Sequence, residues 1–323
     1  MFTNKDIEHR TIYVINCIKD RTLRVSNGEL LLEETEERKT LTKLPFQKIL
    51  ALFVIGHIQV TTPLIEKCKK YSVALVVMKP SLRPVFFWSN SAEANYLLRQ
   101  RQYAYDKEDI TIAKWIVSYK VRNQLTLLQK TRRTDELTLQ AKTVCEKALG
   151  QWMGRVVTSN KLMGLEGYVS KFFFAAYFQE YDWKIRMPRT KCDILNATLD
   201  IGYTILFNYI ECFVRMFGFD VYVGVYHRLW FKRKSLICDL MEPFRCIIDR
   251  TVRTAYNRKQ FVANDFKLHK GEYRLKYEKN ADYYHVFYEA LIPYKMEIFT
   301  FIRLYYRSFM RGNDVSTYPN FYI

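Results

Sequence analysis

Hydrophobic and polar residues alternate in two different ways along the chain, and the change falls near residue 90. Before it, short apolar or β-branched runs are separated by polar turns, a pattern typical of strands. The dipeptide Asn27-Gly28 indicates a hairpin, because a two-residue turn needs positive φ at both central positions. Strands are expected at residues 11–17, 22–25, 30–32, 49–54, 73–78 and 85–88, with a solvated loop or edge at 33–39 and one helix at 62–70.

From about residue 91, apolar residues recur three and four positions apart, which predicts helices. One such stripe consists of Leu162, Leu165, Val169, Phe172 and Ala176. Further helices are expected at 110–133, 136–153, 194–217, 239–261 and 283–310, and residues 313–323 are expected to be loosely held. The sequence therefore predicts an α+β fold, with a small N-terminal β-sheet domain over residues 1–90 and a larger all-α domain over residues 91–323.

The charge balance points to a polyanionic partner. The 323 residues include 51 Lys and Arg against 33 Asp and Glu, a net charge of +18, which is typical of proteins that bind nucleic acid or a membrane surface. The longest purely apolar run, residues 49–55, is far shorter than a membrane span. The seven cysteines are scattered and form no Cys-x-x-Cys pair, which indicates a reducing compartment. The polar N-terminus does not resemble a secretory signal. We therefore expect a cytoplasmic nucleic-acid-binding protein that does not associate with a membrane.

Several common catalytic loops are absent from the sequence. It contains no Gly-x-x-x-x-Gly-Lys-Ser/Thr, no Gly-x-Gly-x-x-Gly and no Gly-x-Ser-x-Gly. ATP-driven and serine-hydrolase functions therefore lack their usual sequence support.

An acidic pair follows a basic, aromatic segment in the helical half. Asp239 and Glu242 stand three apart, which makes them neighbours on a helix and leaves two interpretations. Either they form a capping pair with Asp239 as the N-cap, or together with the upstream His227 they bind a divalent metal. In the second case the nearby cations would hold DNA backbone phosphates. These cations are Arg228, Lys232, Arg233, Lys234 and Arg245.

Glu166 is the third acidic candidate. It lies between Gly164 and Gly167, and each glycine lowers helix stability by about 1 kcal/mol relative to Ala. Such glycines are expected where another backbone approaches closely. The alternative is a surface glutamate that pairs with a residue one helical turn away.

Three segments occur in an order that resembles the CRISPR-associated spacer-acquisition integrases, a family of metal-dependent endonucleases. They are Glu166-Gly167, Gly224-Val-Tyr-His227 and Asp239-Leu-Met-Glu-Pro-Phe-Arg245. Residues 195–206 and 51–57 add weaker matches, so the resemblance spans nearly the whole chain. The sequence departs from the family at Asp200-Ile201, where an Asn and an aromatic residue are common, and at Cys246, where a second Pro often follows.

The resemblance implies that Glu166, His227 and Glu242 bind one Mg²⁺ or Mn²⁺ and that Asp239 supports them, so that all four are catalytic. It places the active site in the helical domain and assigns the β domain to homodimer formation. Two such dimers would flank a dimer of the small, ferredoxin-like CRISPR-associated partner protein, and the assembly would bind double-stranded and branched DNA. The implied reaction joins the 3′-OH of spacer DNA to a phosphodiester of the CRISPR array, a step of antiviral adaptive immunity.

The residues alone leave two other functions open. One is a metal-dependent repair nuclease that cleaves branched DNA without integration. The other is a non-catalytic nucleic-acid-binding subunit, in which the acidic residues are caps and surface pairs. In the catalytic interpretations a Tyr or Phe near the site is expected to stack on an unpaired strand end, and the sequence does not choose which one.

Overall fold

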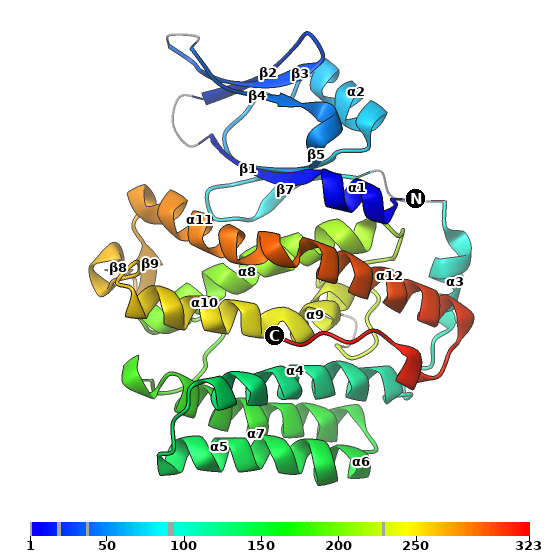
Figure 1. Ribbon diagram of the computed structural model, residues 1–323, viewed down its shortest axis with the longest axis vertical. Coiled ribbons are helices and arrows are strands. Elements are labelled where there is room, and N and C mark those ends of the chain that lie inside the picture. Colours follow the sequence, from blue (N-terminus) through cyan, green and yellow to red (C-terminus); the bar gives the residue numbers. More distant parts are fainter. Residues whose placement is uncertain (1, 18–20, 37–38, 90–93, 182, 228–229) are drawn as a thin grey trace.

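A small strand region lies at one end of the molecule and a larger helical region fills the rest (Figure 1). The computed structural model describes residues 2–323 except 18–20, 37–38, 90–93, 182 and 228–229. This arrangement confirms the predicted α+β fold. The predicted division between residues 90 and 91 lies outside the described residues and stays a prediction.

Among the described residues, two sheets and one helix between them form most of the strand region. In the four-stranded sheet β1 (Thr11–Cys17), β5 (Ile49–Gly56) and β6 (Ala74–Met78) are parallel, and β7 (Pro84–Trp88) pairs antiparallel with β6. The antiparallel sheet consists of β2 (Arg21–Ser26), β3 (Glu29–Glu34) and β4 (Thr40–Pro45). Asn27 and Gly28 both have positive φ, as the hairpin requires. The acidic run expected as a solvated loop or edge begins inside β3, and β4 was not predicted.

The central strand β5 is buried on both faces. Leu52 and Val54 belong to the core between the two sheets, which α2 (Thr62–Tyr71) helps to close. On the other face the ring of Phe53 lies 6.3 Å from that of Tyr209 and 5.7 Å from that of Tyr288, both in the helical region. A strand covered on both faces has no polar side, which explains the uninterrupted apolar run in the sequence.

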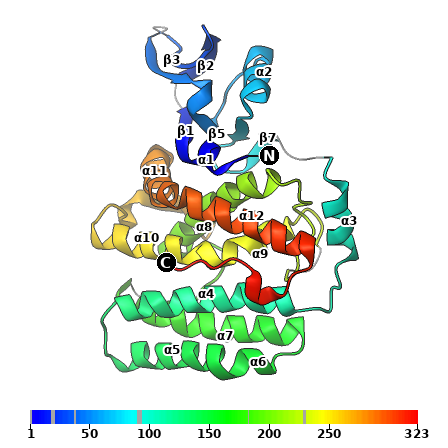
Figure 2. The ribbon, with the colours of Figure 1, turned by 45° about the vertical axis from the view of Figure 1, so that its right-hand side comes forward.

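The helical region forms two layers beneath the sheet (Figures 1 and 2). The layer nearest the strands contains α8 (Ile194–Arg215), α9 (Ser235–Met241), α10 (Arg245–Asn257), α11 (Asn280–Leu291) and α12 (Lys295–Arg311). The far layer contains α4 (Thr111–Lys130), α5 (Glu136–Lys147), α6 (Met153–Arg155) and α7 (Ser159–Tyr177). The remaining elements are α1 (Asn4–His9), α3 (Tyr96–Ala104), β8 (Phe266–His269) and β9 (Glu272–Leu275). None of the described helices is long and apolar enough to cross a membrane.

Two helices predicted as continuous are each divided by a 3₁₀ turn. The segment 239–261 is α9, a turn at Glu242–Phe244, and α10. The segment 283–310 is likewise α11, a turn at Ile292–Tyr294, and α12. Each turn contains a proline, which has no N–H for the helical ladder and therefore interrupts it. The break after α9 places Glu242 at a corner of the chain.

The C-terminal segment is held against the helices, so the expectation that it is loose was wrong. Tyr318 and Phe321 are buried, and the ring of Phe321 lies 4.4 Å from that of Phe244. The amide of Asn123 on α4 donates to the carbonyl of Phe321 and accepts from the N–H of Ile323. The segment thereby ties α4 to the turn that carries Glu242.

Candidate active site

Two carboxylates from different elements meet at one ammonium group. Lys120 lies on α4, and its Nζ forms ion pairs with Glu166 on α7 and with Glu242 in the turn after α9. The distance from Nζ to Oε2 of Glu242 is 2.8 Å. Since a single cation touches both groups, the fold brings the carboxylates of Glu166 and Glu242 to a common point.

Glu242 is the most deeply buried member of this cluster. It is 1% exposed, and its Oε2 also lies 2.9 Å from Nε of Arg245, three residues further on. Within the described residues this oxygen has ion-pair neighbours but accepts no well-directed hydrogen bond. A buried carboxylate oxygen in that position retains a lone pair for a further cation.

Glu166 is held in its charged form. Burial alone would raise the pKa of its carboxyl, but the Lys120 ammonium and the hydroxyl of Tyr226, which donates to Oε2, together lower it to about 2. The reciprocal effect acts on Lys120: burial opposes its charge, and the two carboxylates outweigh burial and raise its pKa. Glu166 and Lys120 are therefore both ionised at neutral pH.

Asp239 holds the loop that carries His227. It is fully buried inside α9, where its Oδ2 accepts the N–H groups of Val225 and Tyr226 at 2.7 and 3.0 Å. A Cβ at Gly224 would overlap this carboxylate, so the glycine is needed for the close approach. The N-cap interpretation of Asp239 is wrong, because the partners of its carboxylate come from a distant loop instead of its own helix.

His227 is oriented by the same carboxylate. Its backbone N–H and its Nδ1 lie 2.9 and 2.6 Å from Oδ1 of Asp239. Because a carboxylate only accepts, Nδ1 carries a proton, which leaves Nε2 as the ring nitrogen that can bind a metal. No described residue hydrogen-bonds to Nε2. A carboxylate that fixes the far nitrogen is the usual support of a metal-binding histidine.

The donors fit a divalent cation in chemical type. Two carboxylates and an imidazole suit Mg²⁺ or Mn²⁺, and the carboxylates already converge on a positive charge. Among the residues that the structure describes, however, no three acidic, His or Cys side chains are gathered as a ready metal site. The ammonium of Lys120 occupies the point that the carboxylates share.

The predicted phosphate-binding cations are not equivalent. Lys232 is exposed and Arg233 is partly exposed, so both are accessible to DNA. Lys234 forms ion pairs with both oxygens of the buried Glu211 at 2.7 Å. Arg245 lies between Glu242 and the ring of Tyr203, with 27% of its side chain exposed. Arg228 lies outside the described residues.

The glycines beside Glu166 do not mark a close backbone contact. A Cβ at Gly164 or Gly167 would meet no atom within 4 Å, so that expectation was wrong. Both glycines are instead exposed.

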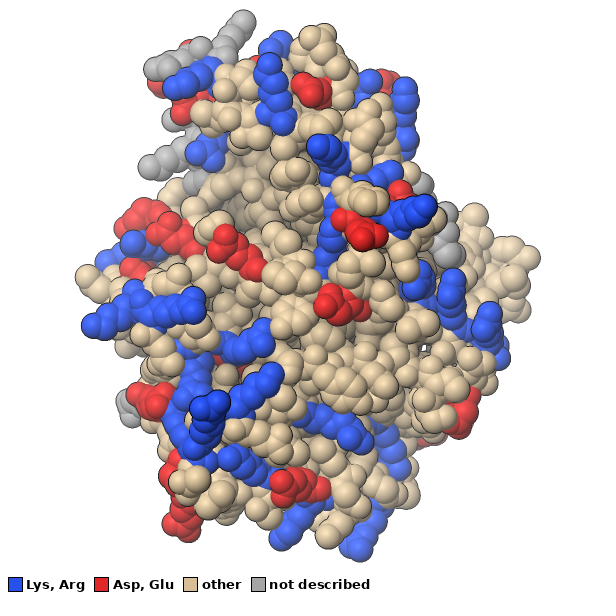
Figure 3. All heavy atoms as spheres, viewed as in Figure 1, with Lys and Arg blue, Asp and Glu red and all other residues tan. Residues whose placement is uncertain are grey.

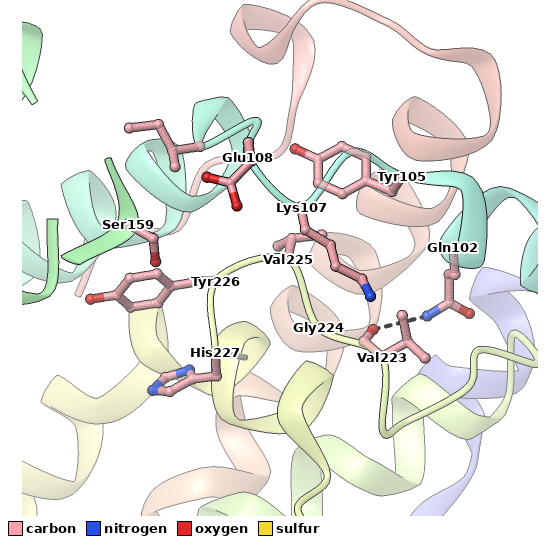
Figure 4. A pocket seen from close by; sticks show the side chains of 11 residues that line it. Gln102, Tyr105, Lys107, Glu108, Ser159, Val223, Gly224, Val225, Tyr226 and His227 are labelled. Atoms are coloured by element: carbon pink, nitrogen blue, oxygen red, sulfur yellow. Dashed lines mark hydrogen bonds between the residues drawn. The ribbon is translucent and has the colours of Figure 1, made fainter. Parts of the chain in front are cut away.

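A cavity of about 300 Å³ adjoins His227 (Figure 4). The segment 223–227 forms one wall, and Tyr105 and Glu108 face it from the connection between α3 and α4. Ser159, at the start of α7, closes a third side. Space for a ligand group therefore lies directly beside the imidazole.

Lys120 and Tyr226 are the site residues that sequence reasoning missed. A signal for Lys120 existed, because it shares one face of α4 with Ile116, Asn123 and Leu127, all of which are buried. A lysine on a buried face needs a counter-charge. For Tyr226 the only signal was its place next to His227.

Lys and Arg side chains outnumber acidic ones on the face of the helical region shown in Figure 3, and they crowd its lower left, over the ends of α4, α5 and α10. Part of the excess of Lys and Arg over Asp and Glu therefore lies on this face as a basic area. Such an area attracts the phosphates of nucleic acid.

In fold, the chain is similar to Cas1 proteins of known structure. It superposes on a Cas1 protein from Thermotoga maritima with a TM-score of 0.77 and 17% identity, over 94% of this chain and 98% of that one. The sequence model of the family "CRISPR associated protein Cas1" matches residues 14–289. The chain belongs to this family.

Curated relatives and further structures agree. Sequences named CRISPR-associated endonuclease Cas1 from Thermodesulfovibrio yellowstonii and Thermus thermophilus are 26% and 25% identical, over 69% and 83% of this chain and 73% and 80% of theirs. A casposase bound to an integration product has a TM-score of 0.76 and 20% identity, with coverage of 96% and 94%. A chain of a Cas6-RT-Cas1–Cas2 complex has a TM-score of 0.76 and 19% identity, with coverage of 96% of this chain and 36% of that one.

Proposed function

We propose that the protein is a metal-dependent DNA endonuclease and integrase that inserts spacer DNA into a CRISPR array. One observation carries the proposal: in a member of the Cas1 family, the carboxylates of Glu166 and Glu242 converge on one cation, and Tyr226, which donates to Glu166, adjoins the imidazole of His227. Relatives named endonucleases support the cleavage of DNA, and the likeness to a casposase bound to an integration product supports its joining.

Glu166, His227 and Glu242 would hold one Mg²⁺ or Mn²⁺, which, when bound, polarises the scissile phosphodiester and stabilises the leaving oxygen. The other residues prepare this site. Asp239 fixes the imidazole of His227 through Nδ1, and Arg245 forms an ion pair with the carboxylate of Glu242. Lys120 holds the two acidic side chains together while no divalent cation is present.

The chemistry is a transesterification. The 3′-OH of an incoming strand loses its proton and forms a new P–O bond with a phosphate of the array. The bond from that phosphorus to its original 3′ oxygen breaks, and that oxygen leaves as a new 3′-OH. With water as the nucleophile, the same residues would give strand cleavage. The protein mainly supplies positioning and electrostatic stabilisation.

DNA and protein partners follow from the same proposal. Lys232 and Arg233 would contact backbone phosphates beside the site. The likeness to a chain of a Cas6-RT-Cas1–Cas2 complex supports an assembly with Cas2, the small partner protein. In that assembly the protein would act as a homodimer joined through its strand region.

A strand-transfer assay tests the proposal. The protein, with and without its small partner, is mixed with Mn²⁺, a labelled short duplex and a plasmid that bears a repeat. Label should join the plasmid covalently with the unaltered protein and with E180Q, which changes a surface acid paired with Arg133. Joining should be lost in E166Q and E242Q, while both variants still bind DNA in EDTA.

Other outcomes would change the conclusion. Cleavage of branched DNA without joining, in the presence of the partner, would identify a repair nuclease. DNA binding without any Mn²⁺-dependent chemistry would identify a binding subunit. A fully active E166Q/E242Q double variant would remove the metal site from the proposal.

A further inference from the structure

Two large aromatic side chains project into solvent a few residues after His227. Trp230 is 75% exposed and Phe231 is 83% exposed. Exposed rings of this size side by side are unusual on a soluble protein and mark an interaction site. Trp230 follows His227 by three residues, so the two Cα atoms lie within about 11 Å of each other.

A tight turn presents both rings. The N–H of Arg233 donates to the carbonyl of Trp230 at 2.9 Å, and Lys232 between them has a φ of 60°. Trp230 and Phe231 are therefore the first two residues of a β-turn with a left-handed third residue. We call these two side chains the aromatic tip.

The base of the tip is fixed on the side of α9. Lys234, immediately after the turn, forms ion pairs with the buried Glu211 of α8. On the other side of the segment, His227 is bound to Asp239. The chain is therefore held three residues before Trp230, by His227, and three residues after Phe231, by Lys234.

We propose that the aromatic tip stacks on unpaired bases at the end of the DNA strand whose phosphate lies at the candidate active site. This inference rests on the proposed function. Because Trp230 stands only three residues after His227, the bases concerned are those close to the reacting phosphate. Stacking needs only the flat face of a base and is therefore tolerant of sequence.

The charges around the tip favour nucleic acid over a protein surface. Lys232 places its Nζ 5.0 Å from the centre of the Phe231 ring, and Arg233 follows directly. A ring accompanied by cations can hold a base and its phosphate at once. An apolar protein contact would instead have to desolvate these cations without compensation. The tip also supplies the stacking aromatic that the sequence alone could not identify.

Binding to two labelled duplexes tests the proposal. Both have the same paired region, but one is blunt and the other carries unpaired 3′ ends that contain 2-aminopurine, whose fluorescence is quenched by stacking. The full-length protein is used in EDTA, so that no cleavage occurs. The variants are W230A and F231A. The control is Y96A, which removes a 71% exposed ring on α3.

We expect W230A and F231A each to bind the duplex with unpaired ends about tenfold more weakly and to lose the quenching. Their affinity for the blunt duplex should not change, and Y96A should behave as the unaltered protein. Because both rings are exposed, far-UV circular dichroism and Tm should be the same for all four proteins.

Two results for W230A and F231A would overturn the stacking role: an equal loss of affinity for both duplexes, and no loss of affinity for either duplex. In the second case, self-association is also measured by sedimentation, and its loss would assign the tip to a protein contact. If the unaltered protein bound neither duplex, the proposed function itself would fail, which is a different result from unaffected variants of a DNA-binding protein.

Discussion

Replacing Lys120 with Met would test whether the ammonium organises the carboxylate cluster. Methionine has a similar length and leaves the packing of α4 largely filled, so the main change is the loss of charge. Glu166 would lose the ammonium that keeps it charged, and Arg245 would remain as the ion-pair partner of Glu242 among the described residues. The variant should therefore be less stable than the unaltered protein when no divalent cation is present.

The magnitude follows from the pKa of Glu166. It is lowered from 4.5 to about 2, a difference of about 2.5 units, and at 1.36 kcal/mol per unit this is about 3 kcal/mol. The unaltered protein gains this stability above the ordinary pKa and loses it as the pH falls through about 2. Removing one partner from a buried ion pair typically destabilises by about 3–5 kcal/mol. We expect a loss of about 3 kcal/mol at pH 7.

Urea unfolding in EDTA, followed by far-UV circular dichroism, measures this loss. Without Lys120, burial should raise the pKa of Glu166 above its ordinary value, so the deficit should shrink as the pH is lowered from 7 to 5. Mn²⁺ should stabilise K120M more than the unaltered protein, since no ammonium competes for the carboxylates. The control is K114M, on the same helix, which removes a lysine that forms no ion pair with the described residues. A loss below about 1 kcal/mol at pH 7, or one independent of pH, would refute the reasoning.

Three further predictions concern other residues. Gly224→Ala should lower the Tm and abolish strand transfer, because the added Cβ overlaps the carboxylate of Asp239; unchanged values would contradict the close packing. Exchanging Lys232 and Arg233 for Gln should reduce the slope of log K against log salt for DNA binding by about 2, and an unchanged slope would exclude phosphate contacts. Burial raises the pKa of Asp249 from 3.8 to about 6, so this carboxyl stabilises the fold below its ordinary pKa and that contribution is lost as the pH rises through 6. Asp249→Asn should remove this loss between pH 4.5 and 7.5, and urea midpoints with the same pH dependence in both proteins would contradict the assignment.

The fold was predictable where the burial of an element gives a simple pattern of apolar residues in the sequence. Strand β5 has apolar neighbours on both faces, and its sequence is correspondingly apolar throughout. Pro243 and Pro293 are themselves signals of a helix break. The helical spacing of apolar residues nevertheless continues across both 3₁₀ turns, so each pair of helices was predicted as one. The strand β4 was missed because it pairs only with the edge of a hairpin, and four of its six residues are exposed.

The site was only partly predictable, since its decisive contacts join residues far apart in sequence. Glu166 and Glu242 were identified through resemblance, and their meeting at Lys120 depends on how α4 packs against the corner after α9. Asp239 matches a local capping pattern, yet its partners lie 12 to 14 residues upstream. A local pattern cannot reveal which of two such arrangements has the lower free energy.

The doubly buried strand β5 also has a mechanical consequence. One sheet contributes side chains to the core above it and to the core below it, so the described strands and helices are packed together across this sheet. A partner bound to the strand region would therefore keep a fixed position relative to the carboxylates. In an assembly of two copies, the gap between the two sets of carboxylates would then be set by the packing of Phe53 against Tyr209 and Tyr288, and so would the length of DNA that fits between them.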